Sequence, residues 1–463
     1  MNKIIGCFIM AVIVSAFCAC QATPQKSFVV NKNDDKLEQT IKATPVPSIQ
    51  QVIDMDKWEE DYTIPNLNCA IKADIVVPDT TVFPVYKVKK RLFDAKLVDK
   101  IVKYLTKGAT GVRQTSPTKE ELTAQLIAAK RGMYVEDDNG GRWESYDGQE
   151  QRIAKLEEQI ENATEESFEP ITDQISPIPF KLTYAMPSGA RLHVEAKESS
   201  VYVTADKYGV IQGESWLGDG GAIPGEPPGT TIEGVKISKE EAIAQLNTLL
   251  SELGINNYGI AEAEEARVVF TYTSEIISKG WQFILTRNDG GGIPVNLYAT
   301  QFGGLLDFRS EEYAERWKQD MITVYIDETG VRFFSWNDPF DITETLNEIV
   351  ALLPFDEVKD RIKNMIKFAF SKSVENGWLN GENIMSVDKI VLTNILIPMK
   401  DDSQHQMMIP AWLVYNTYYL EYNGQIVDES KSVFAVNAID GSSIDLSMRS
   451  LEFEAHRKQA LGY

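Results

Sequence analysis

The chain has 463 residues, of which 43% are hydrophobic and 25% are charged, and its formal net charge is −22. This length is enough for two or three domains of ordinary globular composition. The negative charge opposes binding to nucleic-acid phosphates, so we expect no nucleic acid among the partners.

The first nineteen residues have the pattern of an export signal. Lys3 supplies a positive charge, residues 4–17 are mainly apolar, and the small residue Ala19 precedes Cys20. A membrane-spanning helix needs about 20 apolar residues, and this stretch is shorter. We therefore predict a signal peptide over residues 1–19.

The end of that signal, from Phe17 to Cys20, resembles the lipobox of bacterial lipoproteins. In a lipobox the cysteine after a small residue is diacylated and becomes the new N-terminus. The resemblance implies lipidation at Cys20, an extracytoplasmic location at the cell membrane, and membrane lipid as a partner. Cys18 is the rival site, but the bulky Phe17 precedes it, and a plain secretory signal is the remaining alternative. Two acyl chains anchor a protein stably, whereas one chain does so only marginally.

Residues 20–61 are predicted to form a flexible tether. They are polar, carry Pro24, Pro45 and Pro47, and show no sustained apolar period. Residues 49–58 have a weak amphipathic pattern, which indicates a short helix leading into the folded part.

The predicted N-terminal domain covers residues 62–217 and places helices before strands. A strand near residues 68–77 opens it. Three helices follow from apolar residues spaced three or four positions apart, and the second begins at Ser116, an N-cap followed by proline. Strands are expected afterwards at 180–185, 191–196, 201–205 and 210–216.

A Gly/Pro-rich linker is predicted over residues 218–236. Eight of the twelve residues from Gly218 to Gly229 are glycine or proline. Neither a helix nor a strand ladder tolerates that density. We therefore expect one independently folding region on each side of the segment.

The predicted C-terminal domain covers residues 237–450, with two subdomains as an option, and a tail follows at 451–463. Its first helix begins in a capping box at Ser238 and ends at Gly254. A second capping box over residues 341–344 predicts a helix that runs to Pro354, and another helix comes next. The Asn-Gly pair at 423–424 is the strongest hairpin signal. Strands are expected at 267–273, 280–286, 295–298, 321–326, 331–336, 390–397, 409–422, 425–438 and 444–448.

Helices thus precede antiparallel strands in both regions. This order predicts an α+β fold of helices followed by antiparallel sheet meanders, repeated in two regions, rather than a parallel α/β sheet. The plan repeats, although the sequence does not.

Three stretches carry a resemblance to an uncharacterised group of lipoproteins from Gram-positive gut bacteria: CQATP at 20–24, MIPAW at 408–412 and FAVNAIDG at 434–441. No activity is established for that group. Over residues 237–446, a capped helix, a meander and a final Asp-Gly turn resemble PepSY-type modules and the YycH and YycI regulators of sensor kinases. A transmembrane helix holds those regulators, and a lipid would take its place here. The architectural resemblance implies a regulatory role.

The histidines and cysteines give no pattern for a metal site or a catalytic base. His193, His405 and His456 have no metal-ligand spacing, so we expect surface or hydrogen-bonded histidines and no cofactor. Cys69 would be the one cysteine besides Cys20 in the mature chain, which leaves no internal disulfide. It lies in a predicted strand, where a buried apolar role is favoured.

Three motifs resemble catalytic or binding sequences and have simpler interpretations. Ser116 to Lys119 matches the Ser-x-x-Lys motif of penicillin-recognising enzymes, but the partner motifs are absent and a helix cap explains it. Residues 136–141 lack the ligand spacing of a calcium loop, which favours an acidic surface turn. No helix follows the glycines of residues 289–292, so a flexible loop is favoured over a phosphate cradle.

Aromatic residues gather on one predicted strand, at 409–422. Sugar-binding surfaces use such rings, and so does a central strand that is covered on both faces, which is the interpretation favoured here. The residues concerned are Trp412, Tyr415, Tyr418, Tyr419 and Tyr422.

These patterns favour a membrane-anchored extracytoplasmic lipoprotein with a non-catalytic interaction or regulatory role and an envelope or membrane protein as its partner. A cell-envelope hydrolase using carboxylates is the enzymatic alternative, and a glycan- or peptide-binding lipoprotein is the third. Cys20 is the one residue assigned a role; no catalytic, cofactor-binding or metal-binding residue is predicted.

Overall fold

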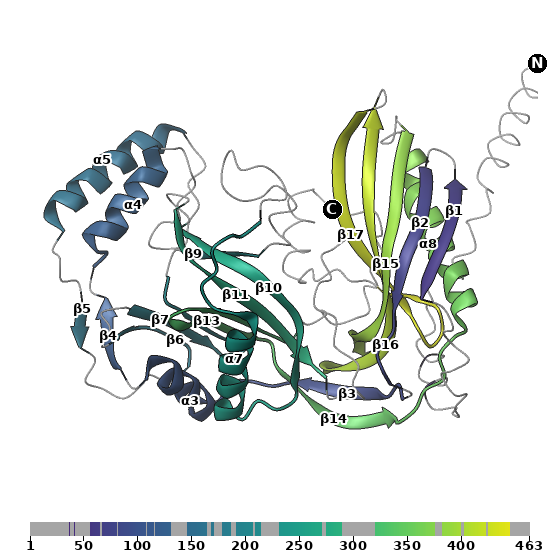
Figure 1. Ribbon diagram of the computed structural model, residues 1–463, viewed down its shortest axis with the longest axis horizontal. Helices are drawn as coiled ribbons and strands as arrows, with labels where there is room; N and C mark the ends of the chain where they lie inside the picture. The colour runs from purple at the N-terminus through teal and green to yellow at the C-terminus, as the bar shows by residue number, and fades with distance from the viewer. Residues whose placement is uncertain are drawn as a thin grey trace, which may run out of the picture. The chain divides into compact units, whose positions relative to one another are not determined.

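The chain forms two compact units (Figure 1). Unit 1 contains Met1–Lys89, Gly290–Trp317 and Ile342–Tyr463, and unit 2 contains Lys90–Asp289 and Lys318–Asp341. Unit 2 is therefore inserted into the sequence of unit 1, and the chain passes between the units four times. The computed structural model describes residues 37, 41, 56–64, 67–80, 82–107, 109–114, 116–130, 146–163, 168–170, 178–186, 191–206, 209–213, 231–270, 275–288, 320–375, 382–399, 402–422 and 425–444.

The predicted α+β class is confirmed. Two sheets dominate the described part of the chain, and its helices are interspersed between groups of strands in sequence. The described helices are α3 (Ala95–Thr106), α4 (Lys119–Lys130), α5 (Tyr146–Asn162), α7 (Lys239–Leu253) and α8 (Phe355–Glu375).

The sheet of unit 2 has ten described strands, and each pairs antiparallel with its neighbours. Their order across the sheet is β5 (Phe168–Pro170), β4 (Thr110–Gln114), β6 (Phe180–Ala185), β7 (Arg191–Lys197), β8 (Ser200–Thr204), β13 (Gly330–Asn337), β12 (Met321–Asp327), β11 (Ile276–Arg287), β10 (Tyr258–Phe270) and β9 (Gly209–Gly213).

Unit 2 repeats one plan twice. Helix α3 precedes β4, β6, β7 and β8, and helix α7 precedes β10, β11, β12 and β13. The two halves meet where β8 pairs with β13, with Val203 opposite Phe334. The repetition expected from the sequence is therefore present, with both copies in one continuous sheet.

The compact units differ from the two regions predicted around Gly218–Gly229. Strands β9 and β10 lie on opposite sides of that segment and pair with each other, with Val268 opposite Ile211. Residues from both predicted domains consequently share unit 2. A Gly/Pro-rich stretch interrupts secondary structure, but it does not end a domain when the strands flanking it pair.

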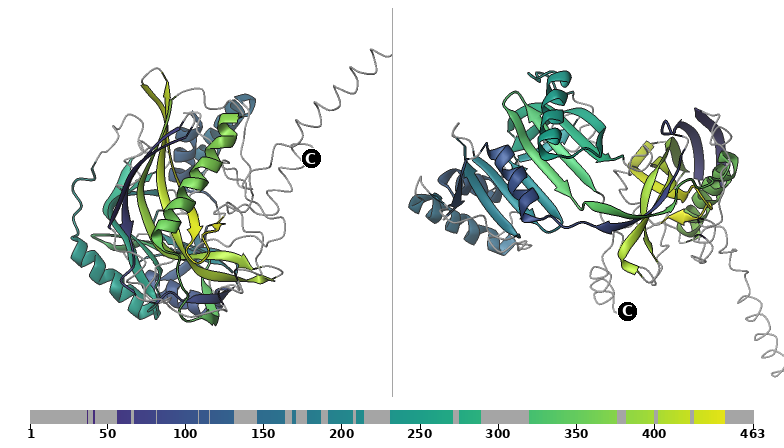
Figure 2. Two further views of the ribbon diagram at one scale, coloured as in Figure 1. Left: turned by 90° about the vertical axis from the view of Figure 1, so that its right-hand side faces the viewer. Right: turned by 90° about the horizontal axis from the view of Figure 1, so that it is seen from below.

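Helices α3 and α7 lie side by side on one face of this sheet (Figure 2). Helix α3 is capped by Asp94, whose carboxylate accepts a hydrogen bond from the Leu97 backbone N–H at 2.8 Å. The predicted capping box of α7 is confirmed, because Ser238 and Glu241 bond each other's backbone. The helix ends at Gly254 with a φ of 74°, the left-handed conformation that glycine adopts without steric cost. Both helices bury apolar side chains against the sheet: Val98, Ile101, Val102, Leu105, Leu246, Leu249, Leu250 and Leu253.

The sheet of unit 1 combines early and late strands of the chain. Its main order is β1 (Lys57–Ile64), β2 (Leu67–Val76), β15 (Glu382–Met399), β16 (Asp402–Tyr422), β17 (Gln425–Asn437) and β18 (Ser443–Ile444). Strand β3 (Val85–Lys90) pairs with both β16 and β14 (Phe340–Asn347). Strands β2 and β15 run parallel, whereas the pairs β1–β2, β15–β16, β16–β17, β3–β16 and β17–β18 are antiparallel.

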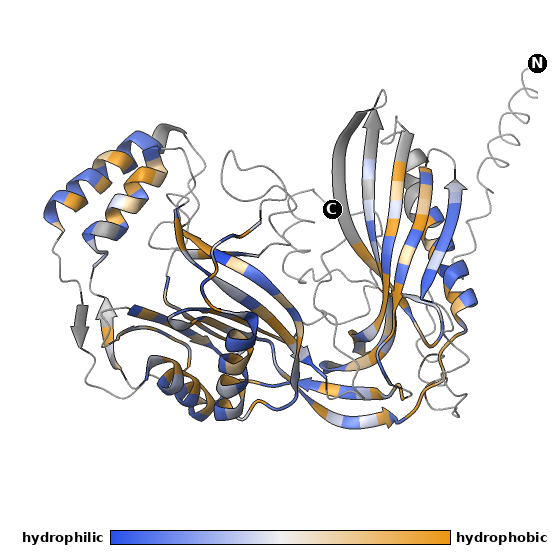
Figure 3. Cartoon of the chain, in the orientation of Figure 1, coloured by the Kyte–Doolittle hydropathy of each residue, from blue (hydrophilic) through white to orange (hydrophobic). Residues whose placement is uncertain are grey.

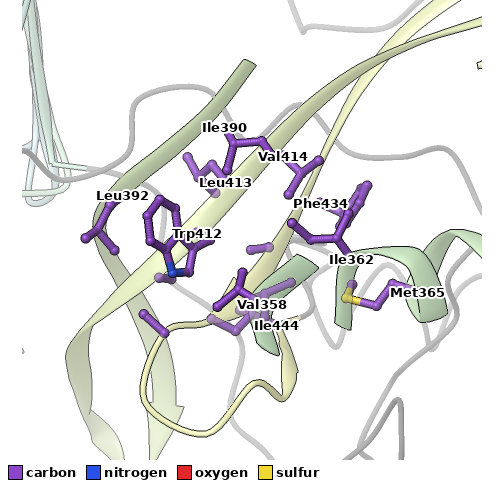
Figure 4. Close-up of a cluster of buried hydrophobic side chains, with 14 of the residues drawn as sticks. Val358, Ile362, Met365, Ile390, Leu392, Trp412, Leu413, Val414, Phe434 and Ile444 are labelled. Carbon is purple, nitrogen blue, oxygen red and sulfur yellow. The ribbon is translucent and has the colours of Figure 1, made fainter. Parts of the chain in front are cut away.

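Helix α8 and the sheet of unit 1 enclose an apolar core (Figure 4). Trp412 is fully buried, and its ring centroid lies 4.9 Å from that of Phe355 at the start of α8. Hydrophobic and hydrophilic residues alternate along β2 (Figure 3), whose buried positions include Leu67, Cys69 and Ile71. This alternation gives β2 one face toward the core.

The helix predicted from the capping box at 341–344 is wrong, because Phe340–Asn347 is strand β14. The Thr343 hydroxyl donates a hydrogen bond to the Lys87 carbonyl of β3 at 3.1 Å. Ile342 and Thr343 are β-branched and suit a strand, and pairing with β3 outweighs the short capping pattern. Helix α8 begins only after Pro354, at Phe355.

Part of the predicted tether over residues 20–61 is folded. Residues 57–61 belong to β1, so the helix expected at 49–58 is wrong at its end. Leu37 and Ile41 are helical and buried in the core of unit 1, and the Asn347 side chain donates a hydrogen bond to the Ile41 carbonyl. Burial alternates along β1, and the buried Trp58 packs edge-on against Phe355 of α8. The charged residues that follow Trp58 hide this alternation in the sequence.

Candidate functional site

A buried carboxylate in unit 2 lies at the centre of a polar network. Asp320 directly precedes β12 and is fully buried. Its Oδ1 accepts hydrogen bonds from the Tyr258 hydroxyl at 2.5 Å and from the Trp336 indole Nε1 at 3.1 Å. Its Oδ2 accepts a longer bond, 3.4 Å, from the backbone N–H of Phe340. Burial of a charge is costly unless such partners are present.

Arg287, at the end of β11, supplies the opposite charge. Its guanidinium lies 3.6 Å from Oδ2 of Asp320 and is itself buried. It also donates to the carbonyl of Phe340 and lies 4.6 Å from the centroid of that residue's ring. Asp320 and Arg287 therefore form a desolvated ion pair whose remaining hydrogen-bonding capacity is met by neighbouring groups.

Two more ion pairs surround this core. Lys90 Nζ lies 2.9 Å from Asp338 Oδ1, and Arg91 lies 3.6 Å from Asp341 Oδ1. The Arg91 guanidinium also lies 5.0 Å from the centroid of the Trp336 ring, a cation–π contact. The network balances three basic against three acidic side chains. We name it the Asp320 cluster, and it consists of Lys90, Arg91, Tyr258, Arg287, Asp320, Trp336, Asp338, Phe340 and Asp341.

Burial sets the proton affinities in the Asp320 cluster. Desolvation raises the pKa of Asp320 from 3.8 to about 6, although the hydrogen bond from Tyr258 and the charge of Arg287 act in the opposite direction. Burial also raises the pKa of Tyr258 well above its usual value. The cluster can therefore take up a proton at Asp320 in mildly acidic solution, while Tyr258 remains a hydrogen-bond donor.

A second carboxylate network lies in unit 1, at the start of β16. Asp402 accepts the Lys87 ammonium at 3.0 Å, and both of its oxygens lie 3.0 Å from Nδ1 of His405. The hydrogen bond with His405 is the main cause that lowers the pKa of Asp402 to about 2, with Lys87 adding to it. This partly exposed network favours the charged carboxylate.

Carboxylates also fix the turns of both units in the same way. Asp327 Oδ1 accepts the backbone N–H of Thr329 at 2.8 Å and its hydroxyl at 2.6 Å. Asp440 Oδ1 accepts the N–H and hydroxyl of Ser442 at the same two distances. Such Asx turns hold the reversal between two strands, and these two follow β12 and β17. The strands expected at 321–326 and 331–336 pair antiparallel, and Asp327–Gly330 forms the turn between them.

The helix cap predicted at Ser116 is two residues too early. Helix α4 begins at Lys119, and Thr118 caps it: its hydroxyl accepts the Glu121 N–H at 3.1 Å, and the Glu121 carboxylate accepts the Thr118 N–H at 2.9 Å. This reciprocal pair is a capping box. Ser116 and Lys119 are both exposed. The serine of the enzyme-like motif thus lies outside the cap, and the motif is explained by the start of a helix.

The other residues singled out in the sequence are found in structural roles or lie outside the described residues. The His193 ring lies 3.0 Å from the Thr183 hydroxyl on the paired strand, and His405 belongs to the Asp402 network. Cys69 is buried in β2 as predicted, and burial raises the pKa of its thiol to about 12. Outside the described residues lie Cys20, His456, residues 136–141 and residues 289–292.

The core interpretation of the aromatic strand is confirmed for Trp412, which is fully buried in β16. Tyr415 packs partly buried against the same core. A ring pair of a different kind lies in unit 2, where Tyr202 is 37% exposed and stands edge-on to Phe333 at 5.0 Å.

The Asp320 cluster was not foreseen from the sequence. Its members are spread from Lys90 to Asp341, on strands that pair only after folding. One signal lies in the sequence: Arg287 ends one apolar strand and Asp320 precedes the next, and antiparallel pairing of these strands places the base and the acid at the same edge of the sheet.

The described residues contain neither a candidate membrane span nor a candidate metal site. No described helix is both long enough and apolar enough to span a membrane. Among the same residues, no three His, Cys, Asp or Glu side chains gather closely enough to hold a metal ion.

Comparison with known proteins gives a likeness of fold. No sequence profile of a protein family matches the chain, and no curated protein matches it in sequence. The crystal structure of an uncharacterised protein from Eubacterium rectale is similar, with 13% identity and a TM-score of 0.50 over 89% of this chain and 99% of that one. The C-terminal domain of YpeB from Bacillus megaterium aligns with 10% identity and a TM-score of 0.26, over 74% of this chain and 99% of that domain. The chain thus shares its fold with an uncharacterised bacterial protein.

Proposed function

We propose that this chain is a lipid-anchored extracytoplasmic protein that acts by binding another protein of the cell envelope, in a regulatory or scaffolding role, rather than by catalysis. The anchor rests on the lipobox-like sequence that ends at Cys20. The binding role rests on the hydrogen bonds and ion pairs that hold the buried carboxylates in place.

The observation that carries the proposal is the bonding of the buried carboxylates. Asp320 is held by Tyr258, Trp336 and Arg287. Asp327 is 1% exposed and is bonded to a turn, while its other oxygen lies 3.4 Å from Arg332. These groups serve the fold of the protein itself. A carboxylate hydrolase needs its acid and base directed at a substrate, so this arrangement supports a structural role for them.

The sheets supply the surface that a binding protein needs. In the described part of the chain, strand β1 lies at one end of the sheet of unit 1 and pairs only with β2. An edge strand leaves a row of backbone groups open to strand addition by a partner protein. A lipid tether would hold this surface at the membrane and raise its effective concentration for membrane partners.

The proposal is tested by cross-linking in cells, followed by capture of the full chain from membranes and mass spectrometry. The matched control is Cys20→Ala, which removes the proposed lipidation site. We expect the wild type to capture one envelope protein reproducibly and the variant to lose it from the membrane fraction. A purified chain that turns over a cell-wall substrate, and loses turnover when one carboxylate is replaced, would contradict the proposal and favour the hydrolase.

A further inference from the structure

Members of the Asp320 cluster lie close in sequence to the four places where the chain passes between unit 1 and unit 2. The passages follow residues 89, 289, 317 and 341. Lys90 and Arg91 begin the first stretch in unit 2, and Arg287 lies just before the second passage. Asp320 lies just after the third passage, and Asp341 is the last residue before the fourth. All members of the cluster belong to unit 2.

Direct bonds link these four segments. The first segment is joined to the fourth by the Lys90–Asp338 and Arg91–Asp341 ion pairs and by a 2.8 Å bond from the Arg91 N–H to the Pro339 carbonyl. Arg287, in the second segment, bonds Asp320 in the third and Phe340 in the fourth. Asp320 accepts from Trp336 and from the backbone of Phe340, both in the fourth segment.

The fourth segment needs this support because of its backbone. Asp338 has a φ of 46°, a left-handed conformation that costs a non-glycine residue free energy. Its backbone N–H donates to the Ser199 carbonyl at 2.7 Å, and its carboxylate pairs with Lys90. The chain is held in this turn by contacts from two other parts of unit 2.

We propose that the Asp320 cluster is a conformational clamp within unit 2: it fastens the four segments of unit 2 that lie next to these passages in sequence, so that loss of one bond loosens all four together. A buried charge that loses its partner is strongly unfavourable. Displacement of one segment therefore destabilises the segments bonded to it. The charged groups that face Asp320 are Arg287 from β11 and, beyond Trp336, Arg91 from the segment after β3. The clamp is inferred from the fold alone. Any role of the clamp in the lipid-anchored protein rests on the proposed function.

Hydrogen exchange of the full soluble chain, read by mass spectrometry, tests the clamp. The variant is Arg287→Met, which keeps the length of the side chain and removes its charge. We expect exchange over residues 88–94 and 336–342, although neither contains the substitution, to rise roughly tenfold more than exchange in α7, which reports the general loss of stability. The matched control is Arg332→Met, which removes the ion pair with Asp206 in the same unit and should leave residues 88–94 unchanged.

Faster exchange confined to residues 284–288 would overturn the clamp, because the segments would then be independent. An equal rise in these segments and in α7 would also overturn it, because the general loss of stability would then explain the whole effect. If Arg287→Met does not fold, the partly exposed Lys90→Met replaces it. A rise that reaches residues 284–288 in that variant supports the clamp, and a rise limited to residues 336–342 contradicts it. Because the soluble chain carries no lipid, this result is independent of whether the proposed anchoring holds.

Discussion

Asp320 in unit 2 and Asp402 in unit 1 both pair with a basic side chain, but their pKa values are shifted in opposite directions. Each lies at the start of a long-range strand pairing and each faces a basic side chain, Arg287 or Lys87. Asp320 is fully buried and its pKa rises to about 6, whereas Asp402 has a side chain 27% exposed and its pKa falls to about 2. The comparison shows that burial, rather than the presence of a cation, decides whether the pKa of the aspartate rises or falls.

The largest expected difference between the two networks is the cost of removing the cation. Arg287→Met leaves the buried Asp320 uncompensated and should lower the free energy of unfolding by about 3–5 kcal/mol. Lys87→Met breaks a partly exposed pair and should cost about 1 kcal/mol or less. Urea unfolding of the two variants measures both values, and equal costs would remove the distinction between the networks.

The pH dependence of stability should have opposite signs at the two aspartates. The folded pKa of Asp320 lies above its unfolded value of 3.8, so its contribution to stability is complete below pH 4 and is lost as the pH rises to about 6. The folded pKa of Asp402 lies below 3.8, so its contribution is present above pH 4 and is lost as the pH falls to about 2. A difference of about 2 in the pKa of Asp320 corresponds to about 3 kcal/mol.

Unfolding curves at several pH values test these signs when wild type is compared with Asp320→Asn and Asp402→Asn. The Asp320 variant should lose the fall in stability between pH 4 and pH 6, and the Asp402 variant should keep it. A wild type whose stability rises over that range through Asp320 would show that its ion pair with Arg287 outweighs burial.

The sequence predicts elements well where the signal is local. Ser238 and Glu241 define the start of α7 within one helical turn, and Gly254 ends it. Asp327 to Gly330 gives the hairpin between β12 and β13. These signals depend on residues a few positions apart, so both interacting residues can be recognised in the sequence.

The errors arise where distant segments decide. Asp341 to Glu344 has a capping pattern, but β3 supplies a strand partner from about 250 residues away in sequence and β14 forms instead. Gly218 to Gly229 has the composition of a domain linker, but β9 and β10 pair across it. The Asp320 cluster was missed for the same reason, because its ion pairs join strands that become neighbours only in the folded sheet.

Helix capping gives a smaller effect that separates two neighbouring hydroxyls. Thr118→Ala should lower the free energy of unfolding by about 1 kcal/mol, because it removes the cap of α4. Ser116→Ala should change it by less than about 0.5 kcal/mol, because that side chain is exposed and outside the capping box. Equal losses in the two variants would place the cap at Ser116 after all.

Proteolysis sharpens the comparison between the predicted regions and the observed units. Brief digestion should cut within residues 218–229, because of their glycine and proline content. The two fragments should then elute together on gel filtration, since β9 and β10 pair across the cut. Fragments that separate under native conditions would favour two independent regions.

The smallest effect concerns Cys69, whose burial raises the pKa of its thiol to about 12. Because the thiolate is the reactive form, iodoacetamide should modify Cys69 slowly in the folded chain and rapidly in urea. Fast modification of the native chain would show that β2 opens readily.

The functional proposal depends most directly on the state of Cys20. Mass spectrometry of the N-terminal peptide of the chain, purified from membranes of its own cells, decides it. The proposal predicts a mature chain that begins at Cys20 and carries a diacylglyceryl group on its sulfur. A chain that retains residues 1–19, or begins elsewhere without lipid, would contradict it.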